Sequence, residues 1–155
     1  MEIKRAGEEH IDGLIHLLKQ VLMVHYEGRP DLFVPHTTKY TPEELRELVK
    51  DDSRPIFVGV DAQDRVLGYA FCIMEQAEGH ALVPVKTLYL DDLCVDETCR
   101  GQHVGQLIYA HVKQYAREQG CYNLTLNVWE CNPTARKFYD AQGLKPLKTY
   151  LEAIL

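Results

Sequence analysis

The chain has 155 residues, of which 46% are hydrophobic and 26% charged, and its formal net charge is −6. This length suits one domain with a sizeable core, and the composition argues against disorder or repeats. The negative net charge leaves no surplus of Lys and Arg to neutralise phosphates, which argues against a nucleic-acid binder. No apolar run approaches the roughly 20 residues that span a bilayer. Five cysteines without C-x-x-C spacing and seven scattered histidines indicate neither a disulfide framework nor a metal site. We therefore expect one cytoplasmic, reduced, metal-free domain over residues 1–155, with no nucleic-acid or membrane partner.

The sequence predicts elements in the order β-α-α-β-β-β-α-β-α-β. Apolar residues recur at helical spacing after Glu8, and Thr41, Pro42 and Glu44 form a helix start with a capping box. The polar tip at residues 63–64 predicts an antiparallel hairpin. In chain order, the expected strands cover residues 1–6, 54–62, 65–75, 87–97, 121–129 and 148–155, and the expected helices begin near residues 8, 42, 104 and 133.

A strand, a helix and a further strand follow one another over residues 88–129. Such a unit implies parallel pairing across a right-handed crossover, whereas the hairpin before it is antiparallel. We therefore expect a mixed α/β sheet with helices packed on it, and no domain boundary.

The turn before the third helix carries the first chemical signal. Residues 99–105 read CRGQHVG, so that Arg100, Gly101 and Gly105 stand at the start of an amphipathic helix. A helix start presents unpaired N–H groups and a partial positive charge, and glycine lets a phosphate approach the backbone. The turn is neither a P-loop nor a Rossmann fingerprint, because the spacing of both motifs is absent. It is a candidate phosphate site, or else a plain strand-to-helix turn in which Gly101 supplies an unusual dihedral.

The surroundings of this turn resemble a known family. With LDDLCV before the turn and NVWECNPTARKFYDAQGLKP after it, residues 88–146 are similar to the GNAT family of N-acetyltransferases. The family's turn motif is Arg or Gln, two residues, Gly, one residue, then Gly or Ala. Here it runs from Arg100 to Gly105, with His103 where the family most often has glycine.

The resemblance implies a GNAT-like acyl-CoA N-acyltransferase fold with acetyl-CoA as the acyl donor. It implies that backbone groups of the preceding strand contact the pantetheine arm, and that one N–H polarises the thioester carbonyl. The strand residues concerned are Leu93, Cys94 and Val95. The residues expected to cradle the pyrophosphate are Arg100, Gly101, Gln102, His103, Val104, Gly105 and Gln106.

Three residues of the last helix complete the expected donor site. A phenol, with a pKa of about 10, can protonate a departing thiolate, and Tyr139 lies at the family's place for that general acid. Its alternative role is packing beside Phe138. Asn132, followed by proline, is a good helix cap and by resemblance also contacts the cofactor. Arg136 is either a phosphate ligand or a solvated charge.

Two adjacent carboxylates, Asp91 and Asp92, are the candidates for the catalytic base. In a regular strand they face opposite ways, so that at most one faces the cleft. The run LYLDDLCV resembles the spermidine/spermine acetyltransferases, which carry a catalytic acidic residue at the position matching Asp91. Asp91 is therefore the predicted base or the anchor for a cationic substrate, with Glu130 and Tyr89 as weaker alternatives. Two solvated carboxylates at a strand end are the other interpretation.

The predicted function is acetyl transfer from acetyl-CoA to a primary amine by direct attack in a ternary complex. The amine is unidentified, although the acidic surface favours a cation. The loops at 25–40 and 79–86 are expected to form the acceptor site. A ping-pong route through Cys131 and a non-catalytic acyl-CoA-binding module are alternatives, and a nucleotide-binding protein ranks behind them. A homodimer in which residues 149–155 pair across chains is left open.

Overall fold

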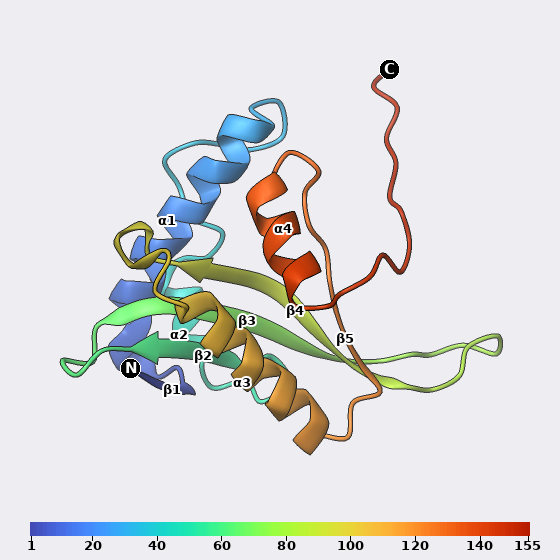
Figure 1. Cartoon of the computed structure of the whole chain (residues 1–155), viewed down its shortest axis with the longest axis horizontal. Helices are drawn as coiled ribbons and strands as arrows, with labels where there is room; N and C mark the ends of the chain where they lie inside the picture. Colours follow the sequence, from blue (N-terminus) through green and yellow to red (C-terminus); the bar gives the residue numbers. More distant parts are fainter.

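The computed structural model describes all 155 residues and contains one five-stranded sheet in the order β1-β2-β3-β4-β5 (Figure 1). Neighbouring strands are antiparallel except for β4 and β5, which are parallel and joined through α3. The mixed sheet predicted from the sequence is therefore confirmed. The strands are β1 (Glu2–Arg5), β2 (Ile56–Val60), β3 (Val66–Gln76), β4 (Lys86–Val95) and β5 (Asn123–Leu126). The α-helices are α1 (Ile11–Gly28), α2 (Pro42–Leu48), α3 (Val104–Glu118) and α4 (Pro133–Ala141), and the 3-10 turns are η1 (Glu8–His10) and η2 (Glu97–Cys99).

The helices bury the two faces of the sheet in separate cores. The first core joins α1 and α2 to side chains such as Tyr69 and Phe71 of β3. The second joins α3 and α4 to Ala70 and Cys72 of the same strand. Successive residues of a strand point to opposite faces, so one strand contributes to both cores. The central strands are thereby held rigid on both sides.

The predicted start of α2 is confirmed in detail. The backbone N–H of Glu44 donates to Thr41 Oγ1 at 3.2 Å, and the backbone N–H of Thr41 donates to Glu44 Oε2 at 2.8 Å. These two bonds form the capping box expected from the sequence. They fix where the long loop after α1 ends, and that loop carries residues of the candidate site.

The predicted C-terminal strand is wrong. After α4 the chain forms no further helix or strand, and every residue from 145 to 155 is exposed. A strand requires a hydrogen-bonded neighbour, and none of these residues makes a backbone hydrogen bond within the chain. Figure 1 shows this segment extending away from the sheet. The strand expected over residues 121–129 is also shorter than predicted, because only Asn123–Leu126 pair with β4.

Candidate active site

The parallel strands β4 and β5 separate partway along β4, at one edge of the sheet. Their pairing runs from Thr87 opposite Asn123 to Leu90 opposite Leu126 and stops there, whereas β4 continues to Val95. The side of β4 that faces β5 therefore has free backbone groups over residues 91–95. Such groups need a hydrogen-bonding partner, which a ligand lying between the strands can supply. This arrangement fits a contact between an extended ligand and the predicted residues Leu93, Cys94 and Val95.

The side chain of Cys94 belongs to the core rather than to this opening. It is buried, and its Sγ lies 3.7 Å from the carbonyl oxygen of Leu17 in α1. Burial raises the pKa of the thiol to about 12, so the group is a neutral thiol at neutral pH. Only the backbone of Cys94 is available to a ligand.

The phosphate turn, residues 100–105, connects η2 to α3. Gly101 has φ +78°, and no atom lies within 4 Å of the position where a Cβ would stand. A left-handed residue with open space beside it suits glycine and leaves the backbone approachable. Gly105 lies against the sheet, because a Cβ there would stand 3.3 Å from Val95 Cγ2. The first N–H groups of α3 have no intrahelical acceptor, as at any helix start, and are free for an anion.

The side chains of the phosphate turn have different surroundings. Arg100 is exposed and makes no ion pair within the chain, so its charge is free for a phosphate. Gln102 Nε2 donates to the Thr98 carbonyl at 3.4 Å. Val104 is buried in the second core, so only its backbone can take part. Arg100 and Lys19 also line a groove of about 430 Å³ between α1 and this turn.

His103 occupies the left-handed region with φ 61°, and its Nδ1 lies 2.7 Å from Gln106 Oε1. Its side chain is exposed, which is compatible with anion binding by the backbone alone. The left-handed conformation costs a non-glycine residue about 1–2 kcal/mol, and glycine loses about 0.5–1 kcal/mol more entropy on folding. We therefore expect His103→Gly to raise the free energy of unfolding by up to about 1.5 kcal/mol in urea titrations. Gln102→Gly is the matched control, because Gln102 has no positive φ; an equal loss of stability in both variants would contradict the prediction.

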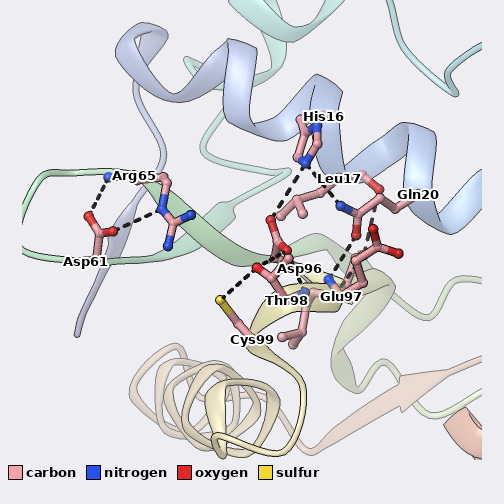
Figure 2. Close-up of polar contacts among 11 residues, drawn as sticks. His16, Leu17, Gln20, Asp61, Arg65, Asp96, Glu97, Thr98 and Cys99 are labelled. Carbon is pink, nitrogen blue, oxygen red and sulfur yellow. Dashed lines mark hydrogen bonds and ion pairs between the residues drawn. The ribbon is translucent and has the colours of Figure 1, made fainter.

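Helix α1 holds the segment that precedes the phosphate turn, as Figure 2 shows. Asp96 accepts from the backbone N–H and the hydroxyl of Thr98 at 2.9 and 2.7 Å, and lies 3.7 Å from His16 Nε2. The hydroxyl bond lowers the pKa of Asp96, which keeps the carboxylate charged. Gln20 Oε1 accepts from the backbone N–H of Glu97 at 3.1 Å. These contacts fix η2 relative to α1, so the turn is oriented before any ligand arrives.

A β-bulge in β4 changes the expected orientation of the two carboxylates. Phe71 pairs with Asp92 but Cys72 pairs with Leu90, so Asp91 is an extra residue without a partner in β3. The extra residue breaks the alternation, and both carboxylates reach groups on the α1 and α2 side. The expectation that Asp91 and Asp92 face opposite ways is therefore wrong.

The two carboxylates have different partners. Asp91 Oδ2 lies 2.6 Å from the ammonium of Lys39, in the loop before α2. Asp92 Oδ2 accepts from the hydroxyl of the buried Tyr69 at 2.9 Å. Burial raises the pKa of Asp92 from 3.8 to about 6 in spite of that hydrogen bond. Asp92 can therefore take up and release a proton near neutral pH.

Tyr139 of α4 lies in the second core, with its ring 5.2 Å from that of Phe138 and 6.5 Å from that of Tyr109. Burial raises the pKa of its phenol, and the negative charge of Asp92 raises it further. The phenol therefore stays protonated and can donate a proton. Because the charge of Asp92 acts on Tyr139, the two groups belong to one electrostatic environment. Packing and proton donation are compatible roles for this residue.

The start of α4 confirms the predicted cap. Asn132 Oδ1 accepts from the backbone N–H of Ala135 at 3.1 Å. Arg136 Nε donates to Asp140 at 3.0 Å along the same helix, so its charge is partly engaged. Arg136 also lines a hollow of about 190 Å³ together with Trp129.

Three aromatic rings from distant parts of the chain meet beside this hollow. The ring of His25 stacks on Phe33 at 5.1 Å, and Phe33 meets the edge of Trp129 at 5.2 Å. A Cβ on Gly28 would stand 2.6 Å from Cys131 Sγ, so the end of α1 touches the loop between β5 and α4. The loop at 25–40 therefore lies beside the hollow, and its role as the acceptor site stays a prediction. The other expected loop, at 79–86, lies at the opposite end of β4 and is not brought to it (Figure 1).

Sequence reasoning missed the partners of the carboxylates, Lys39 and Tyr69. Lys39 stands in a loop without periodicity, and nothing in the sequence relates it to Asp91. Tyr69 offered a signal, because a hydroxyl in an otherwise apolar strand needs a buried partner. The facing acidic residue in β4 supplies that partner.

Neither a membrane-crossing helix nor a metal-binding cluster occurs in the structure. None of its helices combines the length and hydropathy that crossing a membrane requires. No three His, Cys, Asp or Glu side chains gather in a way that could hold a metal ion.

The comparisons with known proteins agree on one family. The sequence profile of the acetyltransferase (GNAT) family matches residues 21–144. The chain is 26% identical over 144 residues to the Probable glucosamine 6-phosphate N-acetyltransferase of Drosophila melanogaster, covering 92% of this chain and 60% of that protein. It is 32% identical over 104 residues to a peptidyl-lysine N-acetyltransferase of Salmonella typhimurium, covering 66% of this chain and 59% of that protein. The chain thus spans about 60% of the length of these two curated relatives.

Among solved structures, mutant forms of a Bacillus halodurans protein superimpose on the chain. One of these crystal structures has a TM-score of 0.95 at 28% identity, and the match covers 100% of both chains. The expected fold class is therefore confirmed by an experimental structure of the same length.

Proposed function

Because this chain belongs to the acetyltransferase (GNAT) family, we propose that it transfers the acetyl group of acetyl-CoA to a primary amine by direct attack in a ternary complex. The observation that best supports this proposal is the separation of β4 from β5 beside the phosphate turn. One ligand can lie along the free backbone of residues 93–95 while its pyrophosphate reaches the N-terminus of α3. Arg100 and the N–H groups of residues 101–106 would then bind the phosphates.

Asp92 and Tyr139 are the two groups proposed for the proton transfers of the reaction. Asp92, with its pKa near neutrality, accepts the proton of the acceptor ammonium directly or through water. The neutral amine attacks the thioester carbon, whose oxygen is stabilised by a β4 backbone N–H. The carbon–sulfur bond then breaks, Tyr139 protonates the departing thiolate, and the second proton of the attacking nitrogen returns to the Tyr139 phenolate, so that a neutral amide and a neutral thiol result. Cys131 is not needed on this route, since the amine attacks the thioester directly.

The acceptor that suits this site is a cationic primary amine. Asp91 holds the ammonium of Lys39, so it presents a carboxylate that an acceptor ammonium can reach by displacing this side chain. The rings of His25, Phe33 and Trp129 offer faces to a cation nearby. The names of the two relatives, one for an amino-sugar phosphate and one for peptidyl-lysine, are both compatible with a primary amine acceptor.

Acetyl-CoA binding measured by calorimetry tests the donor site. We expect Arg100→Glu to raise the Kd by about tenfold or more, because a charge-assisted hydrogen bond contributes about 1.5–3 kcal/mol. Arg117→Glu is the matched control, since it reverses the same charge at the other end of α3 and should leave the Kd unchanged. Wild-type protein that does not bind acetyl-CoA would contradict the proposal.

If the protein binds acetyl-CoA, the next experiment is a screen of primary amines as acetyl acceptors. Turnover with one class of amine would identify the acceptor. Binding without turnover on any amine would support the alternative of a non-catalytic acyl-CoA-binding module with the same fold.

A further inference from the structure

Lys39 places a primary amine at the carboxylate that is proposed to anchor the acceptor. Its ammonium lies 2.6 Å from Asp91 Oδ2, and the Asp91 side chain is only 17% exposed. Lys4 and Lys50 form ion pairs as well, but with carboxylates that lie outside β4. Lys39 is therefore the paired lysine whose partner is also the proposed partner of the substrate.

Asp91 stands at the point where β4 loses its pairing with β5. The preceding residue, Leu90, is the last residue of β4 to pair with β5, opposite Leu126. The free backbone of β4 begins with Asp91 and continues to Val95. Because the proposed donor lies along residues 93–95, the Lys39 ammonium is held next to the segment that would bind the donor.

The ammonium of Lys39 also interacts with the proposed base. Partial burial opposes its charge, but the hydrogen bond to Asp91 raises the pKa of Lys39, and the negative charge of Asp92 adds to this rise. In turn, burial raises the pKa of Asp92, while the charge of Lys39 opposes that rise. The two groups therefore share one electrostatic environment, as a base and the ammonium that it deprotonates must.

The loop before α2 holds the backbone of Lys39 in this place. Thr38 Oγ1 donates to the Tyr40 carbonyl at 2.6 Å, and the Tyr40 ring stacks on Phe71 of β3 with 5.6 Å between the ring centroids. The Lys39 ammonium lies 5.5 Å from the centroid of the Tyr40 ring. An amine held in this way meets a bound donor without a bimolecular encounter, which favours reaction between them.

The other interpretation of this contact is an ion pair that only fastens the loop. The Lys39 side chain is 46% exposed, and an ion pair that is open to solvent contributes little to stability. The capping box at Thr41 and the stacking of Tyr40 fix the loop without it. The ammonium can therefore leave Asp91 and turn toward a thioester at little cost.

We propose, on the basis of the acetyl transfer proposed above, that Lys39 is an internal acceptor. The chain acetylates its own Lys39 on Nζ when acetyl-CoA is bound and no amine has displaced this side chain from Asp91.

Atoms and charges balance in this reaction. The Lys39 ammonium gives one proton to Asp92, directly or through water, and its nitrogen attacks the thioester carbon. The carbon–sulfur bond breaks, Tyr139 protonates the departing thiolate, and the nitrogen passes a further proton to the Tyr139 phenolate. Asp92 then releases its proton to solvent, which leaves an amide and the free thiol of coenzyme A. The amide is uncharged and no longer pairs with Asp91, so each chain reacts once.

The intact mass of the chain after incubation with acetyl-CoA alone tests the proposal. We expect a gain of one acetyl group, which peptide mapping places at Lys39, and which forms at least about tenfold faster than acetylation of any other lysine. Lys39→Arg keeps the positive charge and should not gain this group. Lys50→Arg is the matched control, since it changes another paired lysine, and should gain the group as the wild type does. An unmodified Lys39, or one that reacts no faster than the other lysines, would overturn the proposal.

A mixture of two chains distinguishes reaction within one chain from transfer between chains. A tagged wild-type chain is mixed with an untagged Tyr139→Phe chain, which keeps Lys39 but lacks the proposed acid. We expect rapid acetylation of Lys39 in the tagged chain alone, with a rate constant that does not change when the protein is diluted. Acetylation of both chains with a rate constant that falls on dilution would show transfer between chains and would overturn the internal acceptor.

Competition with an external amine tests whether Lys39 and the substrate share one site. An amine that turns over should slow the acetylation of Lys39, because both bind at Asp91; acetylation that is not slowed by saturating amine would contradict the shared site. Turnover of an amine by a chain whose Lys39 stays unmodified would overturn the internal acceptor and leave the proposed function intact. A chain that does not bind acetyl-CoA would contradict both.

Discussion

Replacing Tyr139 with phenylalanine should lower kcat for amine acetylation by about a hundredfold or more while leaving acetyl-CoA affinity unchanged. The reason is that general acids contribute about 10²–10⁴-fold, and the hydroxyl is the only group lost. The aromatic ring stays in the second core, so packing against Phe138 and Tyr109 is preserved. Steady-state kinetics with the amine found in the screen, together with calorimetry on the same preparations, measure both quantities.

Tyr109→Phe is the matched control for this substitution. Tyr109 is buried in the same core and burial raises its pKa as well, but it lies on α3 and not on the helix that carries the candidate acid. Its loss of a hydroxyl should leave kcat unchanged. If the Tyr139 variant turns over like the wild type, Tyr139 is a core residue and the acid must be sought elsewhere.

Asp92→Asn should lower turnover by a similar factor and at the same time raise the stability of the folded protein. Without a carboxylate near the acceptor, kcat should fall by about 10²–10⁴-fold, the range of general-base contributions. In the wild type, kcat should rise with pH through about 6 as Asp92 ionises, and the variant should lack this acidic limb. A pH profile measured on both proteins tests the assignment.

The stability effect follows from the direction of the same pKa shift. The folded-state pKa of Asp92 is raised from 3.8 to about 6, so the native state binds more protons than the unfolded state between these values. Stability therefore falls as pH rises through this window, and the ionised group is unfavourable at pH 7. Asn keeps an acceptor for the Tyr69 hydroxyl without the charge, and should raise the free energy of unfolding at pH 7 by up to about 3 kcal/mol. Lower activity with higher stability cannot result from misfolding.

The Asp91→Asn variant distinguishes the role of Asp91 from that of Asp92. It removes the partner of Lys39 and the proposed anchor for the acceptor, so KM for the amine should rise more than kcat falls. An acidic limb that disappears with Asp91 but persists in Asp92→Asn would reverse the two roles.

Much of the fold could be predicted from the sequence because the signals are local. Thr41, Pro42 and Glu44 specify the start of α2 through contacts within one turn, and Asn132 does the same for α4. The C-terminal strand was predicted wrongly although residues 148–155 have a strand-like pattern. A pattern reports which face a strand would bury but not whether a neighbouring strand is present in the same chain.

The candidate site could be predicted only where a motif lies within a few residues. The turn from Arg100 to Gly105 is such a motif, and the structure places it at a helix start beside free backbone. The bulge at Asp91 depends on the register between two strands, which no short stretch of sequence encodes. The ion pair between Lys39 and Asp91 joins residues 52 positions apart and is set by the course of a loop.

The parallel pairing of β4 with β5 also determines when the site comes into being as the chain folds. Strands β2, β3 and β4 follow one another as neighbouring antiparallel strands, and their contacts close short loops. β5 reaches β4 only after α3 has crossed the sheet, and contacts between distant residues form more slowly because longer loops must close. An intermediate without this last pairing has both carboxylates on β4 but lacks Tyr139 packed in the second core. The catalytic site is therefore complete only after β5 has paired with β4.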